Sequence, residues 1–340
     1  MNSKQVYVNG VKDVQIIDCE LDADNLKPTE CLIETYVSYI SPGTELSRVF
    51  GLKKGAVYPM QPGYCSVGKV LKKGTEVYQA EVGDVVYFEA PHGSHQIYDY
   101  TKTSGSLYKL NAETTYEEGA FLTMCLIAMN GILPVDVKLG DTCVILGLGT
   151  LGLILSVLYK EAGAKVIAVD PMKNRCQQAR EMGIACTVDC APEEQVTAIM
   201  SLTGGKGAEI VVDATGLSAC IETCVKLAAK HGQVVLLGSP RTDYITNVTP
   251  VFNAIHMKML TVIGALNSRY PYEEVKGSRL CIERNLKYLE DLYSKKVIDV
   301  NKFISHRIPP TSEALMEAYD GLMNRKDRYT GVVINWKEDK

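Results

Sequence analysis

The chain has little of what marks a nucleic-acid-binding or extracellular protein. Its 340 residues have a formal net charge of −4, and no extended block of basic residues occurs. Proteins that bind nucleic acids need such basic patches to follow the phosphate backbone. The eleven cysteines are scattered, with no CxxC pair and no group of four at the spacing of a structural zinc site. Nucleic-acid partners are therefore not expected, and the unpaired thiols fit a reducing cytoplasm.

The sequence also lacks a clear signal peptide or membrane span. The first residues, MNSKQVYVNG, contain no apolar core of the kind that secretory signals have. The longest apolar stretch, residues 143–159, is shorter than the roughly 20 residues that cross a bilayer, and it contains three glycines. A strand, a turn and the start of a helix explain it better. We expect a soluble cytoplasmic protein with no membrane partner.

The length and the change of pattern along the chain predict two domains. Short β-like runs separated by glycine and proline fill about the first 115 residues. From residue 141, apolar strands alternate with helical segments, which is typical of a doubly wound parallel sheet. We expect a mostly β domain over residues 1–123, completed by residues 266–340, and a second domain over residues 124–265.

Six strands and five helices are expected in the second domain. The strands are expected at 143–148, 165–170, 185–190, 209–215, 233–238 and 260–265. The helices are expected at 149–163, 175–183, 192–205, 218–232 and around 252–259.

The first of these strands leads into a glycine-rich turn, Gly147-Leu148-Gly149-Thr150-Leu151-Gly152. A GxGxxG between a strand and a helix is the dinucleotide-binding fingerprint when an acid follows the next strand, and Asp170 stands there. The first glycine permits the tight turn, the second lets the backbone approach a pyrophosphate, and the third allows close packing of the helix. The motif predicts a dinucleotide cofactor at the start of this helix.

Asp170 favours NAD over NADP. A carboxylate at this position accepts hydrogen bonds from the ribose hydroxyls of NAD and would repel the 2′-phosphate of NADP. Arg175 follows closely and is expected to lie along the adenosine ribose. The predicted cofactor site also includes residues at the helix start and after the later strands: Thr150, Leu151, Thr215, Gly238 and Ala265.

The order of these motifs resembles the medium-chain dehydrogenase/reductase superfamily over nearly the whole chain. The resemblance rests on VSYISPGTELSRVFG (37–51), PGYCSVGKVLKKG (62–74), VGDVVYF (82–88), VILGLGTLG (144–152), VVDATG (211–216) and ISHRIP (304–309). It implies an α/β fold with a GroES-like, mostly β catalytic domain and a Rossmann domain with six parallel strands. It also implies a homodimer that pairs the strands at 260–265.

The zinc ligands of alcohol dehydrogenases in this superfamily do not match this chain. The positions of the three catalytic ligands hold Pro42, Tyr64 and Thr123, none of which replaces a thiolate, an imidazole or a carboxylate. The glutamate that follows the histidine ligand is replaced by Cys65. The chain is therefore similar to a zinc-independent branch, the bacteriochlorophyllide-type hydroxyethyl dehydrogenases, and no metal is expected.

Another group must then stabilise the alkoxide that zinc would hold. The candidates for this role are Tyr64, Thr44, Glu45, His92 and His95. Tyr64 is a proton donor and acceptor if a neighbouring group assists it, or it only fills the place of the metal. His92 or His95 is a possible relay of the proton to solvent, and Glu45 is expected to orient its loop.

These residues predict an NAD-dependent, zinc-independent dehydrogenase that interconverts a secondary alcohol and its ketone. The small-molecule substrate is a sugar, a polyol or a related polar alcohol. Two alternatives remain open at this point: an enoyl or quinone reductase that uses NAD(P)H, and a dinucleotide-binding protein without turnover.

Overall fold

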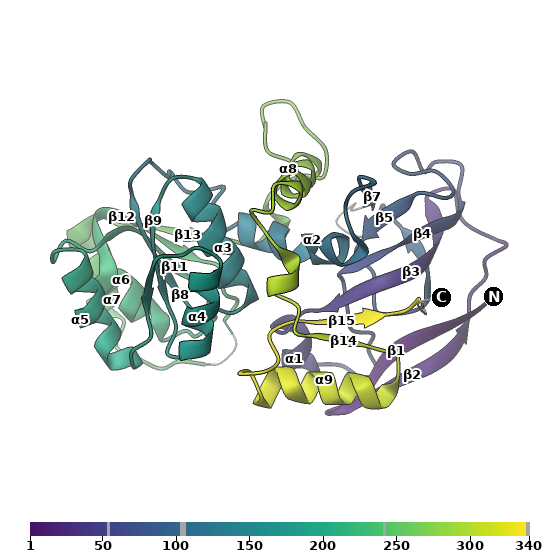
Figure 1. The fold of residues 1–340 in the computed structure, drawn as a ribbon, viewed down its shortest axis with the longest axis horizontal. Coiled ribbons are helices and arrows are strands. Elements are labelled where there is room, and N and C mark those ends of the chain that lie inside the picture. The colour runs from purple at the N-terminus through teal and green to yellow at the C-terminus, as the bar shows by residue number, and fades with distance from the viewer. Residues whose placement is uncertain (53–54, 103–106, 241–242, 338–340) are drawn as a thin grey trace. The chain divides into compact units, whose positions relative to one another are not determined.

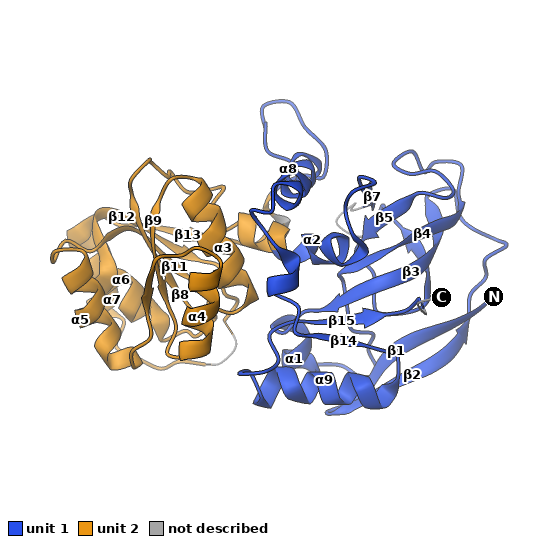
Figure 2. Ribbon diagram, viewed as in Figure 1, with its two compact units in different colours: residues 1–124, 270–340 blue, residues 125–269 orange. Residues whose placement is uncertain are grey.

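The computed structural model describes residues 1–52, 55–102, 107–240 and 243–337. The chain divides into two compact units, shown in Figure 2. Unit 1 contains residues 1–124 and 270–340, and unit 2 contains residues 125–269. The sequence placed these boundaries after residues 123 and 265. Unit 1 is thus assembled from two segments of the chain, with unit 2 inserted between them.

Unit 2 is a parallel six-stranded sheet covered by helices on both faces (Figure 1). Its strands are β8 (Thr142–Leu146), β9 (Lys165–Val169), β10 (Cys186–Val188), β11 (Ala208–Asp213), β12 (Ala228–Leu236) and β13 (Thr261–Gly264). Its helices are α3 (Thr150–Glu161), α4 (Lys173–Glu181), α5 (Pro192–Leu202), α6 (Cys220–Leu227) and α7 (Thr249–Lys258). The spatial order β10-β9-β8-β11-β12-β13 is the Rossmann order, so the predicted fold class is confirmed.

One helix of unit 2 is shorter than predicted. The segment 218–232 is rich in alanine and was expected to be helical throughout, but α6 ends at Leu227. The following residues extend β12 toward its N-terminus, where Ala228 pairs with Ala208 of β11. Pairing with a neighbouring strand therefore outweighs the helical preference of alanine, which is a weak local effect.

Unit 1 contains a two-stranded ribbon, a larger sheet and three helices that close it. The strands of the ribbon are β1 (Asn2–Gly10) and β2 (Asp13–Glu20). The larger sheet contains β3 (Glu30–Ile40), β4 (Ser66–Lys73), β5 (Val85–Phe88), β6 (His95–Asp99), β7 (Leu107–Lys109), β14 (His306–Ile308) and β15 (Val332–Asn335). The helices that close it are α1 (Thr44–Val49), α8 (Ile282–Ser294) and α9 (Ser312–Asn324), and a short 3-10 turn, η2 (Val300–Lys302), follows α8. Another 3-10 turn, η1 (Asn267–Arg269), ends unit 2. Strand β15 pairs with β3, so the C-terminal segment completes the sheet that the N-terminal segment begins.

Helix α2 (Tyr116–Met129) was not predicted. Its residues from Ala120 to Leu126 are all buried, so the sequence shows no alternation between a polar face and an apolar face. A helix that is apolar on every side gives no amphipathic signal.

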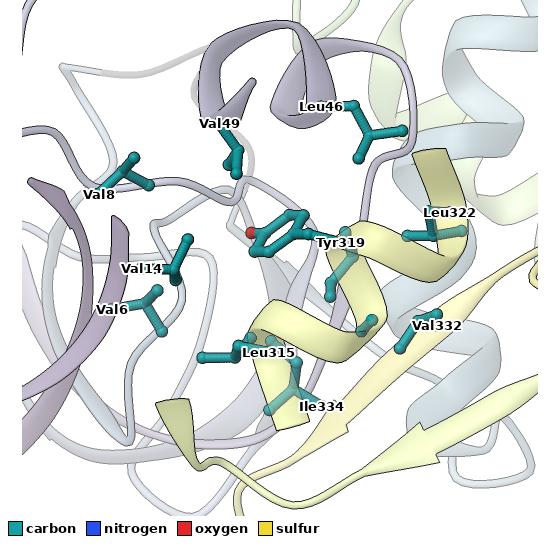
Figure 3. Close-up of a cluster of buried hydrophobic side chains, with 12 residues drawn as sticks. Val6, Val8, Val14, Leu46, Val49, Leu315, Tyr319, Leu322, Val332 and Ile334 are labelled. Atoms are coloured by element: carbon teal, nitrogen blue, oxygen red, sulfur yellow. The ribbon is translucent and has the colours of Figure 1, made fainter. Parts of the chain in front are cut away.

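A cluster of buried side chains joins both segments of unit 1 (Figure 3). Tyr319 and Leu315 of α9 pack with Leu46 and Val49 of α1 and with residues of β1, β2 and β15. The aromatic ring of Tyr319 lies among these apolar side chains, and its hydroxyl group extends beyond them to a polar partner described below. Packing in this core therefore fixes the position of α1.

No helix within the described parts of the chain has both the length and the apolar character that a membrane span requires.

Candidate functional site

The glycine-rich turn lies between β8 and α3, and its geometry needs glycine at its first and third positions. Gly147 has φ +91°, and a Cβ atom there would lie 2.7 Å from Cγ2 of Thr215. A Cβ on Gly152 would lie 1.9 Å from the carbonyl oxygen of Gly147. Gly149 has open space where its Cβ would be, and it is the N-cap of α3, so no side chain caps that helix. A pyrophosphate fits this exposed helix start, because backbone N–H groups there favour anions.

Thr150 and Leu151 form the first turn of α3, with Thr150 buried and Leu151 partly exposed. The other predicted cofactor residues follow neighbouring strands. Thr215 follows β11, Gly238 follows β12 and Ala265 follows β13. Because all strands of this sheet are parallel, these residues lie at the same edge as Gly147. Ligands of doubly wound sheets bind at this edge, where the strand order reverses between β8 and β11.

Asp213, which the sequence reading missed, organises this edge. Its Oδ1 accepts hydrogen bonds from the backbone N–H of Thr215 (2.8 Å) and from the Thr215 hydroxyl (2.6 Å). Gly238 packs against the backbone of Gly216, since a Cβ there would lie 2.2 Å from the Gly216 nitrogen. The only local sign of this role was an aspartate at the end of a buried strand.

Asp170 follows β9 and is 3% exposed. Its Oδ2 accepts from the backbone N–H of Leu148 (2.9 Å) and from Nη1 of Arg175 (3.2 Å), and its Oδ1 accepts from the N–H of Met172 (2.9 Å). The carboxylate therefore binds the glycine-rich turn to the end of β9. Arg175 lies next to the acid, so ribose hydroxyls would share the carboxylate with this side chain or displace it.

The second group of candidates lies in unit 1, where Tyr64 follows a glycine turn. The N–H of His92 donates to the carbonyl oxygen of Pro62 (2.8 Å). Gly63 has φ +101°, and a Cβ there would lie 2.7 Å from the His92 ring. The turn therefore rests directly on His92, and only glycine fits there.

The phenol of Tyr64 has two hydroxyl neighbours. Its Oη lies 2.5 Å from Oγ of Ser41 and 3.4 Å from Oγ1 of Thr44. Burial, together with the nearby Cys65 thiol, raises the pKa of Tyr64 above its ordinary value. The side chain is therefore a protonated hydrogen-bond donor at neutral pH.

Glu45 and His92 form a buried pair, with side chains 2% and 0% exposed. Glu45 Oε2 lies 3.0 Å from His92 Nε2 and accepts from the Tyr319 hydroxyl at 2.7 Å. Glu45 Oε1 accepts from the backbone N–H of Ser41 at 2.7 Å. Glu45 thus contacts Ser41, His92 and Tyr319 through its two carboxylate oxygens.

His95 has different surroundings. Its Nδ1 lies 3.2 Å from Oγ of Ser94, and its strand β6 pairs it with Glu34 of β3. Burial lowers the pKa of His95, and the Glu34 carboxylate opposes this shift. Within the described residues, no hydrogen bond joins His95 to Tyr64, Ser41 or Thr44.

A chain of hydrogen-bonded side chains begins at Thr123, whose hydroxyl lies 3.4 Å from the carbonyl oxygen of Tyr64. Thr123 donates to the Tyr87 hydroxyl at 3.0 Å, and Tyr87 donates to Glu89 at 2.8 Å. Cys65 is fully buried, and burial raises the pKa of its thiol well above the ordinary value. The protonated thiol of Cys65 is thus a buried packing group rather than a nucleophile.

The side chains at the expected metal position do not suit zinc. Tyr64 is a protonated phenol, and the Thr123 hydroxyl is engaged by Tyr87. Within the described ranges, no three His, Cys, Asp or Glu side chains gather as a metal site. The donor set therefore lacks the nitrogen, sulfur and carboxylate ligands that zinc takes.

Four residues of this group were missed by the sequence reading: Ser38, Ser41, Tyr319 and Trp336. Ser41 stands in the quoted motif ISPGTE, where its neighbours Thr44 and Glu45 drew attention instead. Tyr319 and Trp336 are hundreds of residues away from their partners, and local patterns give no signal for such contacts.

The known proteins that this chain resembles in sequence are described as dehydrogenases. Residues 150–280 match the family model described as "Zinc-binding dehydrogenase". D-guloside 3-dehydrogenase of Shigella flexneri is 29% identical over 51% of this chain and 50% of its own length. Sorbitol dehydrogenase of Gallus gallus is 26% identical over 77% of each chain. The chain thus spans about half the length of the first relative and about three quarters of the second.

Solved structures show the same fold. A dehydrogenase of the zinc-binding type from Sinorhizobium meliloti, solved with NADP, has a TM-score of 0.79 at 19% identity and covers 98% of this chain and 99% of its own. An alcohol dehydrogenase from Escherichia coli, solved with NADH, has a TM-score of 0.79 at 17% identity with the same coverage. The chain is thus similar to zinc-type dehydrogenases in sequence, over residues 150–280 for the family model, and it shares their fold.

Proposed function

We propose that the protein is an NAD-dependent oxidoreductase that interconverts a secondary alcohol and its ketone by hydride transfer without a catalytic zinc. The observation behind this proposal is the Tyr64 phenol, which stands where the family holds a metal ligand and lies within 3.4 Å of two hydroxyl groups. A neutral phenol donates a hydrogen bond to a carbonyl oxygen and stabilises the negative charge that hydride addition creates. Unit 2 contains the residues proposed to bind the cofactor, and unit 1 contains the proposed proton donor.

The bound dinucleotide would accept or donate the hydride. Gly147, Gly149 and Gly152 would hold its pyrophosphate at the start of α3, and Asp170 would accept hydrogen bonds from its ribose. Both NADP and NADH occur in structures of this fold. The buried carboxylate of Asp170 supports NAD, because a 2′-phosphate next to it would be repelled.

The substrate class follows from the polar surroundings and from the relatives. Two relatives are named for the oxidation of a guloside and of sorbitol, which are a sugar derivative and a polyol. Thr44 adds a hydroxyl group 3.4 Å from the Tyr64 phenol, and Glu89 adds a carboxylate beside Tyr87 in unit 1. Hydroxyl and carboxylate groups both bind hydroxyl-rich molecules well. A polyol or a sugar is therefore the proposed substrate.

A screen with NAD⁺ tests the proposal. Purified protein is mixed with NAD⁺ and a panel of polyols, sugars and sugar phosphates, and NADH is followed by absorbance. The reverse screen uses the corresponding ketones with NADH. Turnover of at least one alcohol–ketone pair is expected. Turnover of activated alkenes with NADPH alone, or tight NADH binding without turnover of any panel member, would contradict the proposal.

Zinc independence has its own test. Activity should persist after dialysis against a chelator, and elemental analysis should find no stoichiometric zinc. One tightly bound transition metal per chain would overturn this part of the proposal, and His92, His95 and Cys65 would then need to be tested as ligands.

We also infer a cytoplasmic homodimer in which two copies pair through β13. This strand is the edge of the unit 2 sheet, and Val262 is 41% exposed there. Nearby apolar side chains, Phe252 and Met257 of α7, are 65% and 64% exposed. An open apolar edge strand favours pairing with a second strand. Light scattering should give the mass of a dimer, and Val262→Lys should shift it toward the monomer.

A further inference from the structure

The Ser41 hydroxyl is the nearest hydrogen-bond partner of the Tyr64 phenol. Ser41 is 2% exposed and lies in the turn between β3 and α1. The turn is closed by two reciprocal bonds, because the N–H of Ser41 donates to Oε1 of Glu45 (2.7 Å) and the N–H of Glu45 donates to the carbonyl oxygen of Ser41 (3.2 Å). Glu45 therefore fixes the position of the Ser41 hydroxyl.

The other oxygen of Glu45 is held from two directions. Tyr319 of α9 donates to it, and His92 Nε2 lies 3.0 Å away. On the far side of the ring, His92 Nδ1 lies 2.8 Å from Oγ of Ser38, which accepts from the indole N–H of Trp336 at 2.8 Å. A carboxylate oxygen only accepts, so the hydrogen between Glu45 and His92 is on Nε2. Nδ1 of a neutral His92 ring then accepts from the Ser38 hydroxyl.

His92 also supports the turn that holds Tyr64. Its backbone N–H binds Pro62, and its ring fills the space beside Gly63. The turn of Ser41 and the turn of Tyr64 are thus both attached to one buried pair, Glu45 and His92. All hydrogen-bonding atoms of this pair have partners within unit 1.

We propose that Ser41 is a positioning residue for Tyr64, and that the His92–Glu45 pair sets the distance between their hydroxyl groups instead of relaying a proton. The proposal rests on the proposed function. In ketone reduction, a bound dinucleotide would supply the hydride to the carbonyl carbon. The Tyr64 O–H bond would break, and its proton would go to the carbonyl oxygen. Ser41 then turns its own hydrogen toward the Tyr64 oxygen and stabilises the phenolate, which solvent later protonates.

A double-mutant cycle tests this inference. Ser41→Ala should lower kcat roughly ten- to hundredfold, since it removes a hydrogen bond to a charged group. In the Tyr64→Phe background the same change should have little further effect, because Ser41 acts through Tyr64. Ser47→Ala is the matched control: it removes a hydroxyl of the adjacent helix α1 that bonds to the Thr44 carbonyl oxygen, and kcat should not change.

Glu45→Gln separates positioning from relay. If the pair positions Ser41, kcat falls at every pH and the pH profile keeps its shape. A relay would instead change the shape of the profile. Additive losses in the cycle, a changed profile, or a Ser41→Ala enzyme within twofold of wild type would overturn the inference.

A second measurement does not need turnover. In protein labelled with 3-fluorotyrosine, the fluorine signal of Tyr64 is identified by its absence from Tyr64→Phe. Ser41→Ala and Glu45→Gln should shift this signal, and Ser47→Ala should not. An unmoved signal in Ser41→Ala would show that the contact does not exist, even if the proposed function holds. A shifted signal in a protein that oxidises no alcohol would preserve the contact and refute the function.

Discussion

At the residue scale, the proposed reaction depends on how the Tyr64 phenol stabilises negative charge on the substrate oxygen, compared with a zinc ion. A zinc ion stabilises an alkoxide through its charge, whereas Tyr64 can do so only through a hydrogen bond and a proton. Burial raises the pKa of Tyr64, which makes it a poor base at neutral pH and a persistent donor. The reduction of a ketone is therefore the direction that this side chain assists best.

Tyr64→Phe should lower kcat by roughly 10²–10⁴-fold, the usual range for a lost general acid. NADH affinity should stay nearly unchanged, because the cofactor residues lie in unit 2. In the wild-type enzyme, ionisation of Tyr64 should not lower kcat below about pH 10, the ordinary value of a tyrosine. Thermal melts must accompany the kinetics to exclude a folding defect. A stable variant that turns over within a few-fold of wild type would mean that Tyr64 only fills space.

Asp170→Ala should weaken NADH binding roughly tenfold to hundredfold and relax discrimination against NADPH. Both effects follow from losing an acceptor for the ribose and a negative charge that repels a 2′-phosphate. Titration of tryptophan or cofactor fluorescence gives the two dissociation constants. Asp136→Ala is a suitable control, since Asp136 is an exposed carboxylate of unit 2 that precedes β8, away from the carboxyl ends of the strands. The prediction is wrong if the wild-type protein prefers NADPH.

At the scale of the elements, two glycine turns with similar backbone angles have different surroundings. Gly63 has φ +101° and contacts the His92 ring, whereas Gly83 has φ +98° and open space around its missing Cβ. Gly83→Ala should destabilise the protein by about 1–2 kcal/mol through backbone strain alone. Gly63→Ala should cost about 1–3 kcal/mol more because of the clash.

The kcat values of the same two variants test whether the turn at Gly63 positions Tyr64 for catalysis. Gly63→Ala should also reduce kcat, because displacing His92 moves the turns of both Ser41 and Tyr64. Gly83→Ala should leave kcat unchanged. Urea unfolding and initial rates measure the two effects, and equal behaviour of the two variants would contradict the role assigned to His92.

Helix α8 is anchored by one buried carboxylate. Glu290, 3% exposed, accepts from the Tyr108 hydroxyl (2.6 Å), the Thr114 hydroxyl (2.7 Å), and both the backbone N–H and the side-chain amide of Asn111 (2.8 Å each). Glu290→Gln should lower the free energy of unfolding by about 1.5–3 kcal/mol, because an amide nitrogen cannot accept these bonds. Glu283→Gln on the same helix breaks an exposed pair with Lys287 and should cost about 0.5 kcal/mol or less. Similar losses of unfolding free energy for the two variants would show that Glu290 does not anchor α8.

The elements differ in how well the sequence predicts them. The strands of unit 2 are predictable because each is a short apolar run beside a turn, and Gly147 to Gly152 is a local pattern with a known structural context. Helix α2 is buried on all sides and has no periodicity. The bonds from Tyr319 to Glu45 and from Trp336 to Ser38 join residues 274 and 298 positions apart. Only the folded sheet brings such residues together, so the sequence pointed to Glu45 and His92 without showing what holds them.

At the scale of the whole molecule, buried thiols and phenols make stability depend on alkaline pH. Burial raises the pKa of Cys31 to about 11, and burial also raises the pKa of Cys65, Cys143 and Cys224 well above the ordinary value of a thiol. In the unfolded chain these thiols ionise near pH 8.5. Above that pH the unfolded state binds fewer protons than the native state, so the free energy of unfolding falls as pH rises.

Urea unfolding in reducing buffer should therefore show full stability below about pH 8.5 and a progressive loss above it. Cys31→Ala should reduce the slope by at most about 1.4 kcal/mol per pH unit, the contribution of one proton. Constant stability up to about pH 10 would contradict the prediction.

The insertion of unit 2 into unit 1 has a consequence for synthesis on the ribosome. Residues 125–269 are contiguous and can fold as soon as they emerge, whereas β3 must wait for β15, which is made almost 300 residues later. The N-terminal half of unit 1 then exposes the edge of β3 and the apolar surface that α9 will cover. We expect chaperones to bind this intermediate, because it exposes an unpaired strand edge and apolar side chains. Trp336, the only tryptophan, follows β15 directly, so its fluorescence reports the moment when the sheet closes.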